Sequence, residues 1–191
     1  CLGSGVLFAA AKAGKSCAQD LDAALDELQT SQHIILQSLL RFQEQNYSSQ
    51  IVHACTDITG FGLLGHLEEM LLASNSQRIK SGKPLLQIRL DVQSIPSFKG
   101  ALSLLGDGYS STLAPANRRA WKLLDGGNGP PLVDLILGDG IAYGSKKYKQ
   151  IIELIVDPQT CGPLLLSCDP AVALELTNDG LWERIGTIES C

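Results

Sequence analysis

One stretch of the chain, residues 51–73, sets the strongest limit on the fold. An apolar run at residues 51–55 is typical of a short strand, a polar turn with two glycines follows, and residues 63–73 return to helical periodicity. Strand, glycine turn and helix in this order are typical of proteins in which helices cover a sheet. The segment therefore predicts an α/β protein.

The rest of the chain supports the same class, because strand-like and helix-like segments interleave. Apolar residues recur at intervals near 3.6 over residues 16–45, which predicts one long amphipathic helix, and residues 86–92 alternate as in a strand with one wet face. Further helices are expected at residues 2–10, 97–105, 115–124, 148–156 and 170–176, further strands at residues 164–168 and 182–188, and surface loops at residues 74–84 and 125–145. We therefore expect a single α/β (α+β) domain over residues 1–191, with a mixed β-sheet covered by helices.

Composition excludes several classes of protein. A chain of 191 residues is long enough for one ordinary domain or two small ones, and 45% hydrophobic with 18% charged residues is typical of a packed globular protein. Fifteen basic against twenty acidic side chains give a net charge of −5, which argues against nucleic acid and against an anionic membrane surface as partners. No apolar run approaches the roughly 20 residues of a spanning helix, so a soluble, cytoplasmic domain is expected.

The cysteines predict reduced thiols. None of the spacings matches a C-x-x-C redox or zinc motif, and we expect most of them to be small, buried, apolar fillers. The six are Cys1, Cys17, Cys55, Cys161, Cys168 and Cys191. The chain begins at Cys1 rather than Met, so we also expect it to be a piece excised from a longer polypeptide.

The turn at residues 56–62 is the main candidate site. Asp57 ends the expected strand and could bind Mg²⁺, while Thr59, Gly60 and Gly62 open the helix, where free backbone N–H groups can face phosphate oxygens. The same residues could equally form a helix cap with its turn. By residue chemistry alone, both interpretations stay open.

A second polar turn, residues 157–164, leads directly into an apolar strand. Asp157-Pro158 is a common start of a turn, and Gly162 permits a close approach of backbone. Cys161 has no basic neighbour in the sequence that would activate its thiol, so we interpret it as a space-filling residue.

Other polar residues are assigned no chemistry. His66 is interpreted as a capping or surface residue, and the other histidines have no partner at metal-ligand spacing. A small basic cluster on one helix, made of Arg118, Arg119 and Lys122, is interpreted as a solvated face, with a phosphate contact as the minor alternative.

The two turns together give the chain a family resemblance. Residues 57–67 and 157–160 resemble the signatures of selenophosphate synthetase (selenide, water dikinase), in its C-terminal half. Further similar segments are residues 2–7, 95–96 and 185–188. The resemblance implies the fold of the C-terminal domain of aminoimidazole ribonucleotide synthetase, which is shared with thiamine monophosphate kinase and hydrogenase-maturation relatives.

The resemblance also implies a reaction and its cofactors. ATP, selenide and water would give selenophosphate, AMP and orthophosphate with Mg²⁺ required, and Asp57 matches an aspartate that joins the Mg²⁺ coordination. Thr59, Gly60 and Gly62 would then shape the loop around the phosphates. In the family, the catalytic Cys or selenocysteine, its Lys, most nucleotide contacts and the dimer interface lie in the N-terminal half, so this chain alone would be inactive and the full-length protein a homodimer.

Two departures from the family pattern affect the expected substrate. Pro163 stands where the family usually has a second glycine and cannot donate a backbone N–H, and residues 110–117 replace a segment rich in glycine. The latter segment looks more like the subgroup fused behind a pyridine-nucleotide-disulfide oxidoreductase domain. Two alternatives therefore remain: another ATP-dependent enzyme of the same superfamily, and a degenerate, non-catalytic partner domain.

Overall fold

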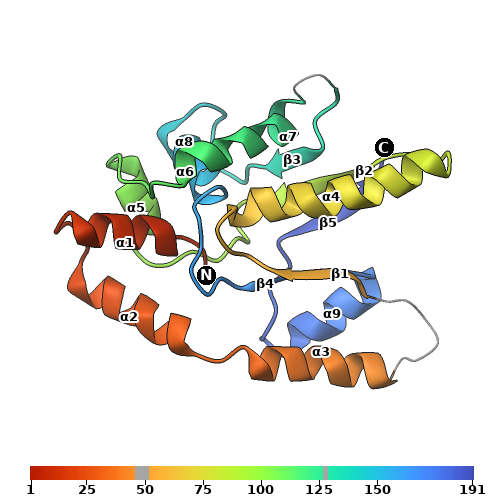
Figure 1. Ribbon diagram of the computed structural model, residues 1–191, viewed down its shortest axis with the longest axis horizontal. Coiled ribbons are helices and arrows are strands. Elements are labelled where there is room, and N and C mark those ends of the chain that lie inside the picture. The colour runs from red at the N-terminus through yellow and green to blue at the C-terminus, as the bar shows by residue number, and fades with distance from the viewer. Residues whose placement is uncertain (46–51, 127–128) are drawn as a thin grey trace.

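Short helices and strands alternate along the computed structural model, which describes residues 1–45, 52–126 and 129–191 (Figure 1). The helices are α1 (Ser4–Lys12), α2 (Ala18–Gln29), α3 (His33–Gln45), α4 (Gly62–Lys80), α5 (Ala101–Gly106), α6 (Ala114–Asn117), the 3-10 helix η1 (Arg118–Trp121), α7 (Lys122–Asp125), α8 (Lys146–Leu154) and α9 (Pro170–Asn178). The strands are β1 (Val52–Asp57), β2 (Leu86–Asp91), β3 (Val133–Ile136), β4 (Leu164–Cys168) and β5 (Gly186–Ser190).

The strands form two sheets. In the described residues, β2 lies between β3, which runs parallel to it, and β5, which runs antiparallel, so this three-stranded sheet is mixed. Strands β1 and β4 form a separate antiparallel pair, in which Asp57 lies opposite Leu164. The α/β class with a mixed sheet is confirmed, although the strands are divided between two sheets.

The main hydrophobic core joins α1, α4 and the three-stranded sheet. Its most deeply buried side chains include Val6, Leu63, Leu64, Leu90 and Val156, each at most 1% exposed. At about 25 cal/mol per Å² of apolar surface, burial of such side chains is the main stabilising contribution to this fold. Both turns singled out in the sequence border this core, because α4 begins where the first turn ends and Val156 directly precedes the second.

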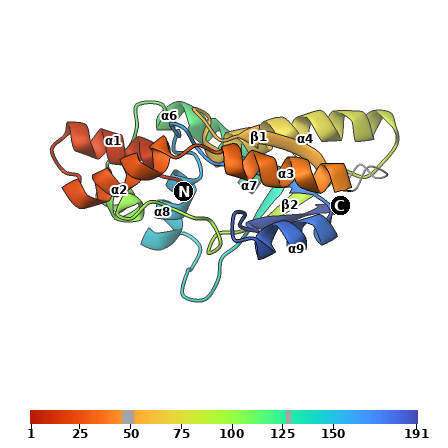
Figure 2. The same cartoon turned by 90° about the horizontal axis from the view of Figure 1, so that it is seen from below.

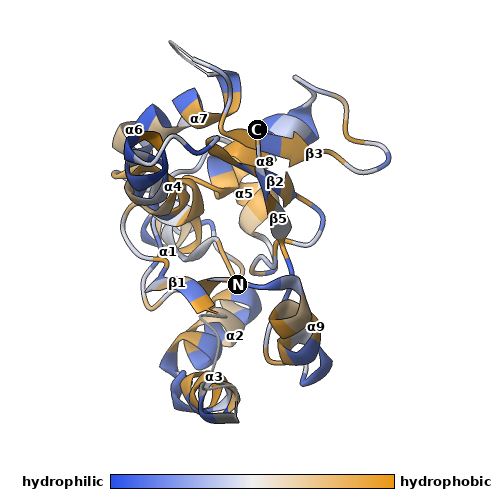
Figure 3. Cartoon of the chain, turned by 90° about the vertical axis from the view of Figure 1, so that its right-hand side faces the viewer, coloured by the Kyte–Doolittle hydropathy of each residue, from blue (hydrophilic) through white to orange (hydrophobic). Residues whose placement is uncertain are grey.

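A second, smaller core lies below the β1–β4 pair in the view of Figure 1. There α3 and α9 pack against each other through Leu39, Val172 and Leu176, with Trp182 at the edge. Seen from below in Figure 2, α3 lies in front of β1, and α1 and α2 lie at the left-hand end of the molecule. The cartoon coloured by hydropathy shows that these outer helices carry both apolar and polar residues (Figure 3).

The predicted helix over residues 16–45 is wrong in its middle. It is divided into α2 and α3, because Thr30 adopts an extended conformation with φ −73° and ψ 124°. Just beyond the break, Gln32 Nε2 donates to the carbonyl of Gly162 at 2.8 Å. The break therefore lets the chain bend toward the second turn, which a periodicity of apolar residues does not reveal.

Two expected loops contain regular structure instead. Helix α4 continues to Lys80 through the predicted loop at residues 74–84, because the Asn75 side chain accepts from and donates to the backbone of Leu86 at 2.7 and 3.1 Å. In the predicted loop at residues 125–145, β3 pairs with β2. Asp134 interrupts the apolar run of β3 and obscured the strand, but its carboxylate lies on the exposed face, 3.8 Å from Arg89.

The cysteines are not the buried fillers expected from composition. All six are free thiols; Cys17, Cys55, Cys161 and Cys191 are exposed, and the other two are half-buried. The core is filled instead by aliphatic side chains; Cys1 and Cys168 pack against its edges, and packing does not account for the four exposed thiols.

Candidate functional site

The loop from Asp57 to Gly62 joins β1 to α4 and is held closely against the backbone of residues 156–163. Ile58 N–H donates to the carbonyl of Pro163 at 2.9 Å, and Gln159 N–H donates to the carbonyl of Thr59 at 2.9 Å. Gly62 has a φ of +70°, and a Cβ placed there would lie 2.8 Å from the backbone carbon of Val156. Glycine is therefore required at this position both by backbone conformation and by space.

His66 braces the loop from inside. Its ring is 6% exposed, and Nε2 accepts the backbone N–H of Thr59 at 3.0 Å and lies 3.2 Å from the Thr59 hydroxyl. Because Nε2 is the acceptor, the neutral ring carries its proton on Nδ1, which lies 3.1 Å from the Glu69 carboxylate. His66 is therefore neither a surface residue nor a cap of α4: its ring is buried and bonds the loop that precedes the helix.

Asn117 holds the same loop from the opposite side. Its Nδ2 donates to the carbonyl of Gly60 at 2.8 Å and to that of Val156 at 3.0 Å, and the residue is buried. No sequence signal identified this residue, because its partner carbonyls lie 57 and 39 positions away.

Fewer backbone donors are available in the loop than the sequence suggested. The N–H of Gly62 donates to the carbonyl of Thr59 at 3.0 Å, and that of Leu64 donates to the carbonyl of Ile155 at 2.8 Å. The N–H groups of Gly60 and Phe61 make no hydrogen bond with any residue that the structure describes. Only this part of the expected phosphate-facing backbone is left for a ligand.

Asp57 lies at the end of β1 with its side chain in solvent. Within the described parts of the chain, its carboxylate has no hydrogen-bond or ion-pair partner. Cys55 is exposed two residues earlier on the same strand, and burial together with the Asp57 charge raises the pKa of its thiol. Cys55 is therefore protonated at neutral pH, whereas the Asp57 oxygens are available to a ligand.

The donor set fits Mg²⁺ only in combination with outside ligands. Among the residues described, no group of three or more His, Cys, Asp or Glu side chains could bind a metal ion. Mg²⁺ is commonly held by one or two carboxylates together with substrate phosphates and water, and the exposed Asp57 carboxylate provides hard oxygen of this kind. A Cβ at Gly60 would meet nothing within 4 Å, so the space beside the loop is open.

The second turn ties the start of the chain to this site. Gln159 Oε1 accepts from Gly3 N–H at 2.9 Å, from Ser4 N–H at 3.1 Å and from the Ser4 hydroxyl at 3.0 Å. The Ser4 hydroxyl in turn accepts the N–H of Thr160 at 2.9 Å. The glycine turn at the start of α1 and the turn at residues 157–160 are thus one hydrogen-bonded unit.

Asp157 is the most deeply buried ionisable group of that unit. Its side chain is 0% exposed, Oδ2 accepts from Val6 N–H and from Gln159 Nε2 at 3.2 Å each, and Oδ1 has no partner in the described chain. Burial raises the pKa of Asp157 to about 7, although the hydrogen bonds oppose the shift. The residue caps α1 rather than facing the open side of the loop.

The departure at Pro163 is accommodated by the backbone. Pro163 contributes its carbonyl to Ile58 N–H, for which no N–H of its own is needed. Gly162 lies so close to the carbonyl of Ile58 that no side chain fits there. Cys161, predicted to fill space, is exposed and has a left-handed φ of 49°, so that prediction is wrong.

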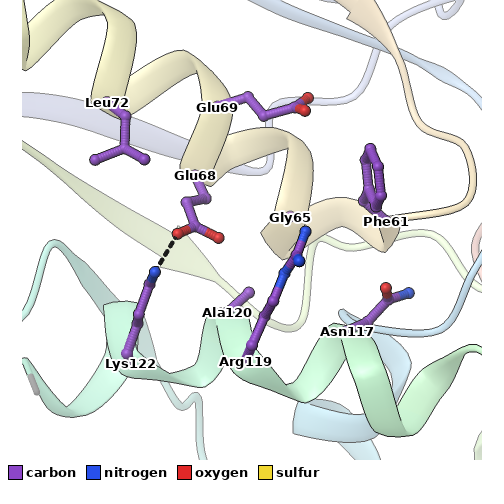
Figure 4. Close-up of a pocket in the computed structure, with 9 residues that line it drawn as sticks. All are labelled: Phe61, Gly65, Glu68, Glu69, Leu72, Asn117, Arg119, Ala120 and Lys122. Carbon is purple, nitrogen blue, oxygen red and sulfur yellow. Dashed lines mark ion pairs between the residues drawn. The ribbon is translucent and has the colours of Figure 1, made fainter.

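A pocket opens beside the loop, between the first turns of α4 and the segment from α6 to α7 (Figure 4). Its volume is about 300 Å³. The residues that line it are Phe61, Gly65, Glu68, Glu69, Leu72, Asn117, Arg119, Ala120 and Lys122. The pocket shares Phe61 and Asn117 with the loop and is therefore continuous with the candidate site.

Comparison with known proteins shows the family to which the chain belongs. The model of the family "AIR synthase related protein, C-terminal domain" matches residues 2–190, and the chain belongs to this family. Among curated relatives, the chain is 29% identical over 92% of its length to a selenide, water dikinase of Treponema denticola. It is 34% identical over 72% of its length to that of Burkholderia pseudomallei, and 34% identical over 65% to that of Caldanaerobacter subterraneus.

The matches cover only part of these relatives. The chain spans 40%, 32% and 28% of their respective lengths. No helix in the described residues has the length and apolar character needed to cross a bilayer.

Proposed function

We propose that residues 1–191 are the C-terminal domain of a selenophosphate synthetase, which makes selenophosphate, AMP and orthophosphate from selenide, ATP and water. The observation that supports this most strongly is the hydrogen-bonded unit of the three similar segments. Residues 2–7, 57–66 and 157–160 are bonded to one another, and the Asp57 carboxylate is left without a partner in the described chain. The curated relatives carry the name of this activity.

The proposed site residues have distinct roles. Asp57 would hold Mg²⁺, which when bound neutralises charge on the phosphate oxygens. Thr59 offers its hydroxyl, Gly60 leaves the space beside the loop open, and Gly62 lets the chain pass close to Val156. His66 and Asn117 fix the loop so that these groups need not reorganise when substrate binds.

The domain would act together with an N-terminal half of the same polypeptide. That half would supply the catalytic Cys or selenocysteine, its Lys and most contacts to ATP, and it would form the homodimer, in the cytoplasm. The geometry of the loop agrees with a site completed by another part of the protein. Asp57 alone offers too few ligands for a Mg²⁺ site, and the space beside Gly60 is open.

The test is ³¹P NMR on the full-length protein that contains this domain, supplied with Mg-ATP under anaerobic reducing conditions. A selenophosphate signal with AMP, present only when selenide is added, is the expected result. ATP that stays intact, or is split to ADP whether or not selenide is present, would contradict the proposed activity.

A further inference from the structure

The segment η1–α7 beside the candidate site carries three basic residues, and two of them form ion pairs. The Arg118 guanidinium lies within 3.0–3.2 Å of the Glu153 carboxylate, and Lys122 Nζ lies 2.6 Å from Glu68 Oε1. Arg119 makes no ion pair and no hydrogen bond with any residue in the described ranges. Arg119 is thus the cation of this cluster that stays available to a ligand.

The position of Arg119 is set by an aromatic contact. Its guanidinium carbon lies 5.7 Å from the centroid of the Phe61 ring, a cation–π distance, and Phe61 belongs to the candidate loop. Figure 4 shows the side chain reaching across the pocket to the first turn of α4, beside Gly65. A guanidinium held against a ring in this way keeps its N–H edge available for the paired oxygens of a phosphate.

The charged side chains that line the pocket are two of each sign, and Arg119 is the cation among them without an ion pair in the described chain. The charge of Glu68 is matched by Lys122, while Glu69, 3.1 Å from His66 Nδ1, also lines the pocket and keeps its negative charge (Figure 4). The positive end of the 19-residue helix α4 points to the same region. The N–H groups of Gly60 and Phe61, which have no partner in the described chain, lie in the adjoining loop.

We propose that the pocket between α4 and η1 binds a phosphate group through Arg119. The ligand class follows from the guanidinium of Arg119 held against Phe61 and from the N–H groups of Gly60 and Phe61, which have no partner in the described chain. The phosphate would be either the terminal group of ATP or the released orthophosphate. Both of these ligands are taken from the proposed function, on which this choice rests.

The test is isothermal titration calorimetry on the full-length protein, with orthophosphate and Mg-ATP as separate probes. The variants are R119Q, R119K and, as a matched control on an exposed arginine elsewhere, R184Q. We expect R119Q to weaken the binding of at least one probe by tenfold or more, R119K to recover part of it, and R184Q to stay within twofold of the wild type. Circular dichroism and the Tm of each variant show whether the fold is kept.

The two probes separate the sources of the phosphate. An effect on Mg-ATP alone assigns Arg119 to the nucleotide, and an effect on orthophosphate alone assigns it to the product. Wild-type affinity of R119Q for both probes overturns the proposal, as does a wild-type protein that binds neither. Because the titrations need no turnover, they are independent of the selenide-dependent signal on which the proposed function depends.

Discussion

At the scale of single residues, two aspartates of the same hydrogen-bonded unit differ in environment. Asp57 is exposed and has no partner in the described chain, whereas Asp157 is fully buried and caps α1. A carboxylate in solvent can bind a cation at little cost, but a buried carboxylate is penalised when it carries a charge. The two residues therefore lead to opposite expectations on substitution.

Replacing Asp57 by Asn should remove the negative charge that the proposed Mg²⁺ site requires while leaving the fold intact. We expect turnover of the full-length protein to fall by about a hundredfold, the usual size of losing one preorganised electrostatic contact. Steady-state assays over a range of Mg²⁺ concentrations, with D139N as the exposed control, provide the measurement. Normal turnover in D57N would remove Asp57 from the metal site.

Replacing Asp157 by Asn should remove a pH dependence of stability. The folded pKa of about 7 lies above the ordinary aspartate value of 3.8, so between these values the folded protein binds the proton that the unfolded chain has lost. The free energy of unfolding therefore falls as pH rises from about 4 to 7, by up to about 1.4 kcal/mol per pH unit, and the contribution is lost above the folded pKa.

Urea unfolding at pH 5 and pH 8 checks this expectation. D157N should show a smaller loss of stability between the two values than the wild type, whereas D139N should show the same loss. An unchanged difference in D157N would mean that Asp157 is ionised in the folded protein across this range.

The residues of the candidate site were predictable where their role is local. Asp57 and Gly62 were identified because a carboxylate after a strand and a glycine before a helix are signals within a few positions. His66 and Asn117 were missed as loop supports, since their function depends on burial and on partners brought together by folding. Whether the identified residues bind Mg²⁺ and phosphate stays a prediction.

At the scale of elements, α4 has a left-handed glycine at each end. Gly62 begins the helix with φ +70° and Gly82 follows it with φ +63°. A Cβ at Gly62 would meet the backbone of Val156, but a Cβ at Gly82 would meet nothing within 4 Å. Comparing alanine at the two positions therefore separates the cost of a left-handed backbone from the cost of steric crowding.

Alanine at these two positions should therefore have unequal effects. G82A is expected to cost about 1 kcal/mol of unfolding free energy, from the left-handed conformation alone. G62A should cost roughly 2–3 kcal/mol or more, because the loop must also move away from Val156. Urea unfolding curves of the two variants measure the difference, and equal losses would show that the contact with Val156 is not tight.

The elements that the sequence misplaced share a physical cause. The end of α2 and the extension of α4 are accompanied by polar side chains that bond to backbone outside their helix, Gln32 to Gly162 and Asn75 to Leu86, and β3 is held by backbone pairing with β2. Periodicity records which residues are apolar, but it contains no information on such pairs. The α/β class was predictable since it needs only the order of elements.

At the scale of the whole molecule, the division of strands between two sheets was not predictable. Pairing of β1 with β4 joins residues more than 100 positions apart, and nothing local distinguishes it from pairing with β2. The resemblance to a family covered most of the chain because its short segments, although far apart in sequence, form one hydrogen-bonded unit. Family membership was therefore predictable, and the number of sheets was not.

The core below the β1–β4 pair is separate from the main core, which implies that the molecule does not open as one unit. The smaller core holds α3 and α9 through three buried side chains, while Ile34, Leu40 and Leu174 on these helices are more than half exposed. Amide protons of α3 and α9 should thus exchange with deuterium long before those of α4 and β2. Asp57 ends the strand at the boundary of the two regions, so the rigidity of the proposed metal ligand would be set by the larger one.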